Sequence, residues 1–561
     1  MRVEEADVVV VGAGPVGLTL AIDLAGRGIK VAVAETRAHA EPPSVKCNHV
    51  AARSMEQYRR LGIVVKVRDA GLPADYPNDV VFRTTVTGTE LTRIAIPCRG
   101  ERYTSREGPD TDWPTPEPPH RINQLYVEPI LLAHAASLPN IELHHRTRVD
   151  SVESAGAGAG ASVSVAATDL DSGAAVQLRG RYLVGCDGAS SMVRRGIGAR
   201  LEGTPVIQRV QSTYIRAPQL AALIPGKRAW SYYAANPRRC GTMFAIDGHE
   251  TWLIHNHLAP DELEFDSVDR DASIRTILGV GPEFEYDVIS KEDWVGRRLV
   301  ADRFRSGNVF IAGDAAHLWV PYAGFGMNAG IADATNLAWL LAARLQGWAE
   351  EAILDAYQAE RQPITEQVSQ FAMDHAQKMI RARGAVPALI EAPGPVGESL
   401  RAQLGDESYQ LNVAQFCCAG LNFGYFYDRS PIVVADGEAA PAYSMGAFTA
   451  STAPGCRAPH FWLADERSLY DAFGPGYTLL RFDAGVDVAP LLAAAAARRI
   501  PLALVDVAGV PVPAQYRHAL VVCRSDQHVA WRGDRVPAAP ARLIDILRGA
   551  GTPGQARAGS A

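Results

Sequence analysis

The sequence is poor in cysteine and has no long apolar run. Eight cysteines are scattered over 561 residues, and none stands in a Cys-x-x-Cys spacing. This pattern excludes a disulfide framework and favours reduced thiols in a cytosolic protein. No cluster of His, Asp or Cys has the spacing of metal ligands, so we expect no metal site. No apolar run reaches the roughly 18 uninterrupted residues that a membrane span needs.

Charge of either sign is also modest. Charged residues make up 21% of the chain, hydrophobic residues 47%, and the net charge is −7. This composition is typical of a soluble globular protein and offers no basic patch for nucleic acid. The N-terminus "MRVEEADVVVVGAG" has no signal-peptide cleavage pattern. We therefore expect a cytoplasmic protein of two or three domains that binds neither nucleic acid nor membrane.

The N-terminal segment carries the first informative motif. Residues 6–35 read as a strand, a turn, a helix and a second strand, which is a βαβ unit. Gly12, Gly14 and Gly17 fit Gly-x-Gly-x-x-Gly, the arrangement that lets a backbone turn tightly and approach a pyrophosphate. Glu35 ends the second strand, where an acid can accept both ribose hydroxyls of an adenosine. The segment predicts a dinucleotide site.

Two later turns carry further polar residues. "YLVGCDGASSMVRR" places Asp187 after a strand, and "NVFIAGDAAHLWVPYAGFGMNAG" places Asp314, His317 and Pro321 between a strand and a helix. Taken alone, the second turn is compatible with a metal site, a catalytic dyad or a plain connection. Residues 206–300 alternate and carry aromatics, which predicts an antiparallel sheet that forms the wall of a pocket.

The coarse organisation follows from periodicity and breaker residues. Helices are expected over 53–70, from about 127 to 136, and after Met327 to about Arg383. The low-complexity "AGAGAGA" reads as a flexible hairpin end. The segment "GAVPALIEAPGPVG" reads as a break before the last third of the chain.

The order and spacing of the three glycine- and acid-containing turns resemble those of the class A flavoprotein monooxygenases of the para-hydroxybenzoate hydroxylase fold, over residues 6–385. Two smaller matches support the resemblance. "HVAARSMEQYRRLGI" is similar to the family's Arg-Thr-Met-Glu helix, with Arg53 as the matching arginine. "RINQLYVEPILL" is similar to its Gln-x-x-x-Glu-x-x-Leu segment, with Gln124 as the flavin contact. Lys46 stands where many members carry another arginine, which keeps the charge but loses the bidentate fork.

The resemblance implies FAD as the cofactor. The residues expected to bind it are Gly12, Gly14, Pro15, Val16, Gly17, Glu35, Thr36, Arg37, Lys46, Arg53, Gln124, Asp187, Gly313, Asp314, Pro321, Gly324, Gly326, Met327 and Asn328. Asp314 would bind a ribityl hydroxyl, and the helix from Met327 would point its N-terminus at the pyrimidine end of the flavin, where reduced flavin carries negative charge. His317 becomes a structural residue of the turn.

The resemblance also implies a reaction. NADPH or NADH, bound only transiently, reduces FAD, and the reduced flavin takes up O2 to give a 4a-hydroperoxide that hydroxylates a phenolic or other aromatic substrate. No second glycine fingerprint exists, which agrees with a transient nicotinamide. The base is less clear, because Asn48 stands where the phenol hydroxylase branch has an aspartate. His49, Tyr232 and Pro321 are the candidate catalytic residues, with Pro321 lining the cavity in which oxygen reacts.

Other interpretations stay open within flavin chemistry. A tailoring oxygenase that acts on a polycyclic aromatic polyketide by hydroxylation, epoxidation or Baeyer–Villiger oxidation would share these motifs. A non-catalytic flavin-binding carrier is a further alternative. The Trp-x-Trp-x-Ile-Pro signature of flavin halogenases and the cysteine pair of disulfide reductases are absent. Substrate identity and nicotinamide preference do not follow from the sequence.

The expected fold class is α/β. A Rossmann-like, glutathione reductase-type FAD-binding domain is predicted over 1–75, 105–205 and 300–400, with a substrate-binding sheet domain inserted over 76–104 and 206–299. Residues 401–548 resemble the C-terminal thioredoxin-like extension of the phenol hydroxylase and polyketide hydroxylase branch. Because this extension lacks a Cys-x-x-Cys, we expect it to be redox-inert and a candidate for subunit association, as in a homodimer. Residues 549–561 read as a disordered tail.

Overall fold

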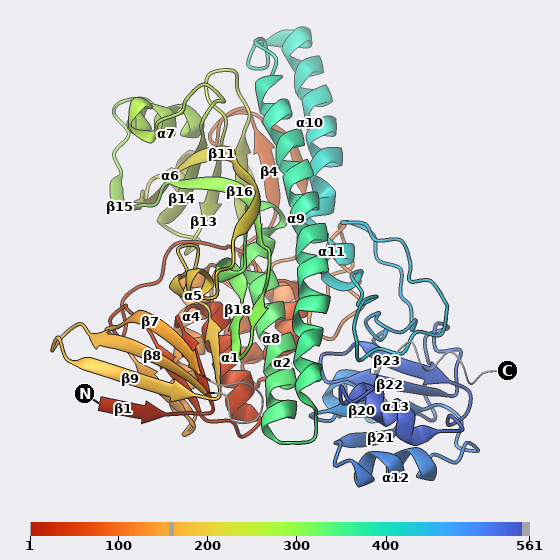
Figure 1. The fold of residues 1–561 in the computed structure, drawn as a ribbon. Helices are drawn as coiled ribbons and strands as arrows, with labels where there is room; N and C mark the ends of the chain where they lie inside the picture. Colours follow the sequence, from red (N-terminus) through yellow and green to blue (C-terminus); the bar gives the residue numbers. More distant parts are fainter. Residues whose placement is uncertain (1, 156–161, 552–561) are drawn as a thin grey trace.

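The computed structural model describes residues 2–155 and 162–551 (Figure 1). Most of the expected hairpin end "AGAGAGA" and residues 552–561 of the expected disordered tail lie outside the described residues. Three bodies are visible in Figure 1, with the N-terminal α/β body at lower left, a large sheet at the top and a C-terminal α/β body at lower right. No helix in the described ranges combines the length and the apolar character that crossing a membrane requires.

The N-terminal body is built on a six-stranded sheet. Its order is β17-β18-β10-β2-β3-β6, and all neighbours are parallel except β17 and β18. The strands are β17 (Arg305–Ser306), β18 (Val309–Ile311), β10 (Tyr182–Gly185), β2 (Val8–Val11), β3 (Val31–Ala34) and β6 (Ile141–His144). The central strands are continuous apolar runs because both faces of the sheet are covered.

Helices cover this sheet, and a second sheet flanks it. The helices are α1 (Pro15–Gly26), α2 (Ala52–Arg60), α3 (Val64–Asp69), α4 (Gln124–Ser137), α5 (Met192–Gly196) and α8 (Phe325–Leu345). The flanking sheet has the order β1-β9-β8-β7, made of β1 (Arg2–Glu5), β9 (Ala175–Gly180), β8 (Ser162–Asp169) and β7 (Thr147–Ala155). The single helix expected over 53–70 is two helices, because Gly62 adopts a φ of 76° between them.

The large sheet has nine strands and joins two segments that are far apart in the sequence. Its order is β19-β16-β11-β14-β13-β12-β4-β5, with β15 also paired to β11. The strands are β4 (Val80–Arg83), β5 (Glu90–Ile94), β11 (Leu201–Arg216), β12 (Ser231–Ala234), β13 (Gly241–Ala245), β14 (Thr251–His257), β15 (Asp287–Lys291), β16 (Trp294–Ala301) and β19 (His317–Trp319). Two short helices, α6 (Leu220–Leu223) and α7 (Arg270–Leu278), lie in its connections.

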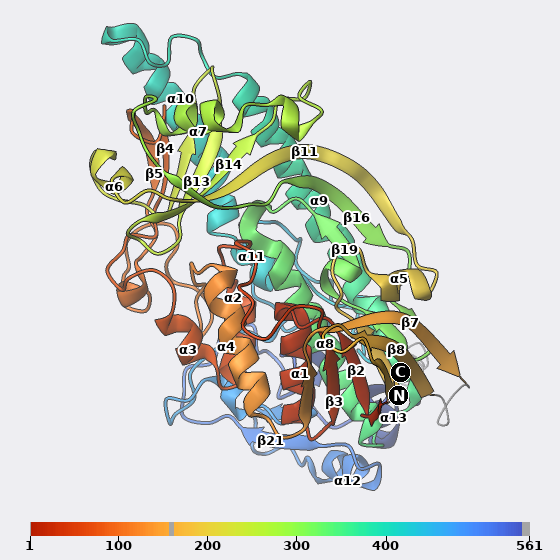
Figure 2. The same cartoon turned by 90° about the vertical axis from the view of Figure 1, so that its left-hand side faces the viewer.

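Two long helices run from the N-terminal body toward the large sheet (Figures 1 and 2). They are α9 (Asp355–Gly384) and α10 (Gly394–Phe416). Helix α10 packs closely on β5, since a Cβ at Gly405 would lie 2.4 Å from the carbonyl oxygen of Leu91. The expected domain boundary at residue 401 falls inside this helix, so we place the start of the C-terminal unit after Phe416. The short α11 (Ala419–Phe423) follows.

The C-terminal sheet has the order β21-β20-β22-β23, in which β20 is parallel to β21 and antiparallel to β22. Its elements are β20 (Tyr477–Arg481), α12 (Ala489–Ala497), β21 (Leu502–Asp506), β22 (Leu520–Arg524), β23 (Val529–Gly533) and α13 (Pro540–Leu547). This is a thioredoxin-like order in which a loop replaces the helix between the second and third strands. Cys456 and Cys523 are free and buried.

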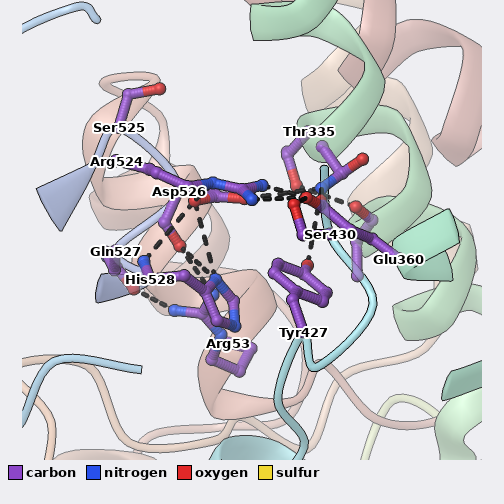
Figure 3. Close-up of polar contacts among 12 residues, drawn as sticks. Arg53, Thr335, Glu360, Tyr427, Ser430, Arg524, Ser525, Asp526, Gln527 and His528 are labelled. Atoms are coloured by element: carbon purple, nitrogen blue, oxygen red, sulfur yellow. Dashed lines mark hydrogen bonds and ion pairs between the residues drawn. The ribbon is translucent and has the colours of Figure 1, made fainter. Parts of the chain in front are cut away.

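A buried ion cluster ties this sheet to α9 (Figure 3). Arg524 donates to both carboxylate oxygens of Glu360 on α9, at 2.5 and 2.8 Å, and to Asp526 at 2.6 Å. Its guanidinium also lies 4.9 Å from the ring centroids of Trp339 and Tyr427. Buried carboxylates of this kind depend on the single cation between them.

Replacing that cation is expected to destabilise the protein strongly. Arg524→Leu leaves Glu360 and Asp526 buried without their charge partner and should lower the free energy of unfolding by about 3–5 kcal/mol. Arg498→Leu, which breaks the partly exposed pair with Asp545, should cost less than about 1 kcal/mol. Urea unfolding followed by circular dichroism measures both, and equal losses would contradict the role given to the cluster.

Candidate active site

A cavity of about 890 Å³ lies between the glycine-rich turn after β2 and one face of the large sheet. Both halves of the protein contribute to its wall. Twelve of the predicted site residues line it, namely Gly14, Pro15, Val16, Arg37, Lys46, His49, Gln124, Asp314, Pro321, Gly324, Gly326 and Met327. The remaining predicted residues, which are Gly12, Gly17, Glu35, Thr36, Arg53, Asp187, Tyr232, Gly313 and Asn328, are not part of the lining.

The glycine turn leaves no room for side chains where the backbones approach. Gly12 has a φ of 102°, and a Cβ there would lie 2.4 Å from the carbonyl oxygen of Cys186, which follows the neighbouring strand β10. A Cβ at Gly17 would lie 2.0 Å from the carbonyl oxygen of Gly12, so α1 can begin directly at the turn. At Gly14, by contrast, a Cβ would meet no atom within 4 Å. The open side of Gly14 and the N-terminus of α1 form an anion cradle in the cavity wall.

Glu35 lies beneath this cradle and is held by backbone amides. It accepts from the amide of Ala13 at 2.8 Å and from the amide of Arg37 at 2.9 Å. Burial raises the pKa of Glu35, but these amides and the Arg37 guanidinium lower it by more, so the carboxylate is ionised. Arg37 in turn pairs with Glu128 on α4 at 2.6 Å. The arrangement presents an acid and an arginine beside the cradle.

The turn after β18 supplies the opposite wall. Asp314, Pro321, Gly324, Gly326 and Met327 line the cavity there. Gly324 has a φ of 63°. Because the N-terminus of α8 begins at the next residue, its free amides face the same region.

His317 is a structural residue of this turn. Its Nε2 lies 2.7 Å from the carboxylate of Asp333 on α8, and Arg361 on α9 donates to the other oxygen of Asp333 at 2.8 Å. The amide of Gly313 also donates to Asp333, at 3.2 Å. Burial raises the pKa of Asp333, but His317 and Arg361 lower it by more. His317 therefore fixes the turn through an ionised carboxylate.

The structure contradicts the prediction that Arg53 contacts the cofactor. Arg53 is not part of the cavity lining, and its guanidinium donates to Glu56 at 2.7 Å. It also donates to the carbonyl oxygen of Asp526 at 3.0 Å and to the side chain of Gln527 (Figure 3). Asp526 and Gln527 are buried in the turn between β22 and β23, so Arg53 joins α2 to the C-terminal sheet. The sequence pattern correctly predicted that Arg53 lies on a helix. It could not predict the partners of Arg53, because a local motif contains no information about residues in the last third of the chain.

Asp187 and Asn328 were also predicted to contact FAD, and both form hydrogen bonds with nearby backbone groups. Asp187 accepts from Ser191, the N-cap of α5, at 2.5 Å and from the first two amides of that helix, Met192 and Val193, at 2.7 and 3.1 Å. Its neighbours Gly188, Ala189 and Ser190 line the cavity instead.

Asn328, at the start of α8, forms hydrogen bonds to two loops. It accepts from the amide of Ala51 at 2.8 Å and donates to the carbonyl oxygens of His49 and Gly324 at 3.0 and 2.6 Å. The side chain thereby holds the segment of His49 and Ala51 against the start of α8.

Strand alternation decides between the two tyrosines of β12. Tyr232, the predicted catalytic residue, is fully buried on the far face of the sheet, where its hydroxyl accepts from the amide of Ala229 at 2.8 Å. Tyr233 faces the cavity. The prediction of Tyr232 was therefore wrong by one position, because a one-residue shift in a strand exchanges the two faces. His255 and His257 of β14 line the cavity together.

His49 lies in the cavity wall with Arg121, a residue that the sequence did not single out. Nη1 of Arg121 lies 2.6 Å from Nδ1 of His49. Since a guanidinium can only donate, Nδ1 of His49 accepts and its proton resides on Nε2. Burial and the nearby Arg121 lower the pKa of His49 well below its usual range. His49 is therefore a neutral side chain with a donor at Nε2 rather than the expected base.

Aromatic side chains from distant segments complete the wall. They are Trp230, Tyr233, Phe244, Trp294, Trp319, Tyr322 and Phe416. Alternation along the predicted sheet could have suggested those on β12, β13 and β16, but no local signal brings the end of α10 to the cavity.

The cavity fits FAD by the chemistry of its donors. The glycine cradle and the amides at the N-termini of α1 and α8 suit phosphate and reduced flavin, and Lys46 adds a cation. Arg37 and Gln124 supply further donors on the same side. Gly14 and Gly324 keep the backbone accessible there.

Comparison with known proteins agrees with this geometry. The FAD binding domain family matches residues 5–372, and the aromatic-ring hydroxylase C-terminal family matches residues 451–550. The chain is 30% identical to the aklavinone 12-hydroxylase RdmE of Streptomyces purpurascens, over 98% of this chain and 99% of that protein. It is 28% identical to phenol 2-monooxygenase of Pseudomonas sp. (strain EST1001), over 98% of this chain and 93% of that protein.

Solved structures agree over the whole length. The rebeccamycin biosynthetic enzyme RebC with reduced flavin superposes with a TM-score of 0.87 at 34% identity, covering 98% of this chain and 100% of that chain. A ternary complex of aklavinone-11 hydroxylase with FAD and aklavinone gives a TM-score of 0.80 at 29% identity, covering 98% of this chain and 99% of that chain.

The chain belongs to the FAD-binding aromatic-ring hydroxylase family. It is an FAD-dependent monooxygenase that uses NAD(P)H as reductant and O2 as co-substrate to hydroxylate a small aromatic molecule. The predicted fold class, cofactors and enzyme class are confirmed.

The glycine turn gives a direct test of the cofactor site. Gly12→Ala should reduce the FAD content of the purified protein by about tenfold or more, because the new Cβ clashes with a backbone carbonyl and strains a positive φ. Gly26→Ala, at the end of the same helix, has open space for its Cβ and should keep FAD. Flavin absorbance per protein measures both, and a yellow Gly12→Ala protein would contradict the assignment.

Proposed function

We propose that the protein hydroxylates an extended, electron-rich polycyclic aromatic substrate, and that single-ring phenols are poorer substrates. The observation that carries this proposal is the aromatic wall opposite the cofactor half of the cavity. An extended π-system gains contact area and favourable ring geometry from such a wall, whereas a single ring covers only part of it.

The wall is a connected set of rings. Trp230 lies 5.4 Å from Phe244 and 6.3 Å from Phe416 between ring centroids. Phe416 is also 6.2 Å from Tyr233. Because these side chains come from β12, β13, α10 and the segment before β12, the wall is rigid, and it can hold a flat molecule in one orientation.

The carboxylates that line the sheet side of the cavity, Glu292 and Asp293, are paired with Lys46 and Arg270. Burial lowers the pKa of His255 to about 4, so it is neutral at physiological pH. Asn48 takes the place of the carboxylate expected in the phenol hydroxylase branch, and its amide oxygen accepts from Asn123 at 2.5 Å. A substrate whose own ring system is already activated suits this wall better than a simple phenol that needs a strong protein base.

The protein's own residues bind the cofactor and orient the substrate. FAD, when bound, supplies the redox and oxygen-transfer chemistry. The glycine cradle, Arg37 and Lys46 hold its anionic part, while the rings around Trp230 and Phe416 exclude water and position the substrate. Relatives that align over nearly the whole chain support the class, since they include an aklavinone hydroxylase, a tetracenomycin B2 monooxygenase-dioxygenase and polyketide hydroxylases. Homodimer formation and a cytoplasmic location stay predictions.

Anaerobic stopped-flow reduction of the FAD-loaded enzyme by NADPH tests the substrate class. A polycyclic quinol should accelerate flavin reduction more than phenol does, and turnover under labelled O2 should give a product heavier by one labelled oxygen atom. Strong acceleration by phenol alone would contradict the polycyclic assignment. A flavin that no nicotinamide reduces under any condition would contradict the function itself.

Neighbouring tyrosines offer a matched test of the wall. Tyr233→Leu removes a ring that faces the cavity and should weaken binding of the polycyclic quinol by about tenfold. Tyr232→Phe, on the opposite face, removes one buried hydrogen bond and should cost about 1 kcal/mol of stability while leaving quinol binding unchanged. Titration of the flavin absorbance and urea unfolding measure these effects, and a reversed pattern would contradict the placement of the wall.

A further inference from the structure

His49 carries a hydrogen-bond donor that no described group accepts. The residue is 3% exposed and lines the cavity, and its Nε2 has no hydrogen-bond partner in the described part of the chain. An unpaired buried donor costs free energy, so a partner is expected when the site is filled.

One edge of the His49 ring packs against the turn after β18. A Cβ at Gly324 would lie 3.0 Å from Cβ of His49 and 3.3 Å from its Cδ2, the carbon bonded to Nε2. Only a glycine lets the turn come this close to the ring. The Cδ2 edge of His49 therefore lies against Gly324, which itself lines the cavity.

Arg121 fixes both the position and the tautomer of His49. Besides its contact with Nδ1, it donates to the carbonyl oxygen of Phe416 at 2.9 Å. Its guanidinium lies 5.1 Å from the ring centroid of Trp230 and 3.8 Å from the buried carboxylate of Asp110. With these contacts made, Arg121 cannot turn away, and Nδ1 of His49 stays an acceptor.

Asp110 completes the support. It accepts from Arg102 at 2.8 Å and from the indole of Trp113 at 2.9 Å. The polar, proline-rich segment before α4 thus anchors the arginine that orients His49. Such support is typical of a side chain whose direction matters for binding.

We propose that His49, oriented by Arg121, donates a hydrogen bond from Nε2–H to an oxygen acceptor in the cavity, either a carbonyl or ring oxygen of the substrate or a carbonyl of the flavin. This inference rests on the proposed function, because it assumes that FAD and an oxygenated aromatic molecule share the cavity. His49 is then a recognition residue, with Arg121 as its positioning residue.

Two variants separate the donor from the packing of the ring. His49→Gln keeps an acceptor for Arg121 and a donor for the cavity, whereas His49→Met keeps the size and only a weak acceptor. With the FAD-loaded enzymes, the dissociation constant of 1,8-dihydroxyanthraquinone and the flavin midpoint potential are measured separately. FAD content and circular dichroism serve as controls for folding.

Loss of the donor has a different consequence for each acceptor. If the acceptor belongs to the bound aromatic, His49→Met weakens binding of the probe by about tenfold and His49→Gln restores it. If the acceptor belongs to the flavin, His49→Met lowers the midpoint potential without the probe, and His49→Gln restores it. Unchanged binding and potential in His49→Met, or changes that His49→Gln fails to restore, would overturn the proposal.

A second measurement determines the tautomer of His49 in the wild-type holoenzyme. In ¹⁵N-histidine-labelled wild-type holoenzyme, the signal that disappears in His49→Gln belongs to His49, and its shift reports which nitrogen is protonated. A proton on Nε2 supports the proposal, and a proton on Nδ1 overturns it. The tautomer and the midpoint potential without the probe need no bound aromatic, so these two measurements remain decisive if the substrate class proposed above proves wrong.

Discussion

The geometry of the site depends on one buried carboxylate. Asp333, which has no exposed surface, receives hydrogen bonds from Gly313, His317 and Arg361, and these belong to the turn after β18, to β19 and to α9. Because the carboxylate is buried among exactly these donors, removing one of them would leave its charge under-compensated. The turn that faces the cofactor, the edge of the large sheet and the long helix are thereby held in one arrangement.

Small residues make this arrangement sterically possible. A Cβ at Gly330 of α8 would lie 2.5 Å from Cγ2 of Val16 and 3.0 Å from Cα of Gly313. Only glycine therefore lets α8 approach both the turn after β18 and the start of α1. The turn after β18 and the glycine turn before α1 are thus brought together by contacts between segments that are about 300 residues apart.

The cofactor half of the site could be predicted from the sequence because its constraints are local. Gly12, Glu35 and Asp314 each follow a buried parallel strand, and the carboxyl ends of such strands meet at one edge. The errors have equally physical causes. Arg53 finds its partners at residues 526 and 527, and Tyr232 was chosen without the register that decides which face of β12 is buried. Neither long-range pairing nor strand phase is contained in a short motif.

The substrate half of the site is assembled from segments that are distant in the sequence. Its wall is assembled from β12, β13, β16, the end of α10 and Arg121, and few of these segments touch the glycine cradle directly. A change of shape in this wall therefore leaves the contacts of the cofactor largely intact, while a change at Asp333 or Gly12 affects both halves. This separation explains why a single FAD scaffold is shared by relatives named for phenol and for aklavinone. The FAD motifs therefore carry no information about specificity, which we propose to be set by the rings around Trp230 and by the orientation of His49.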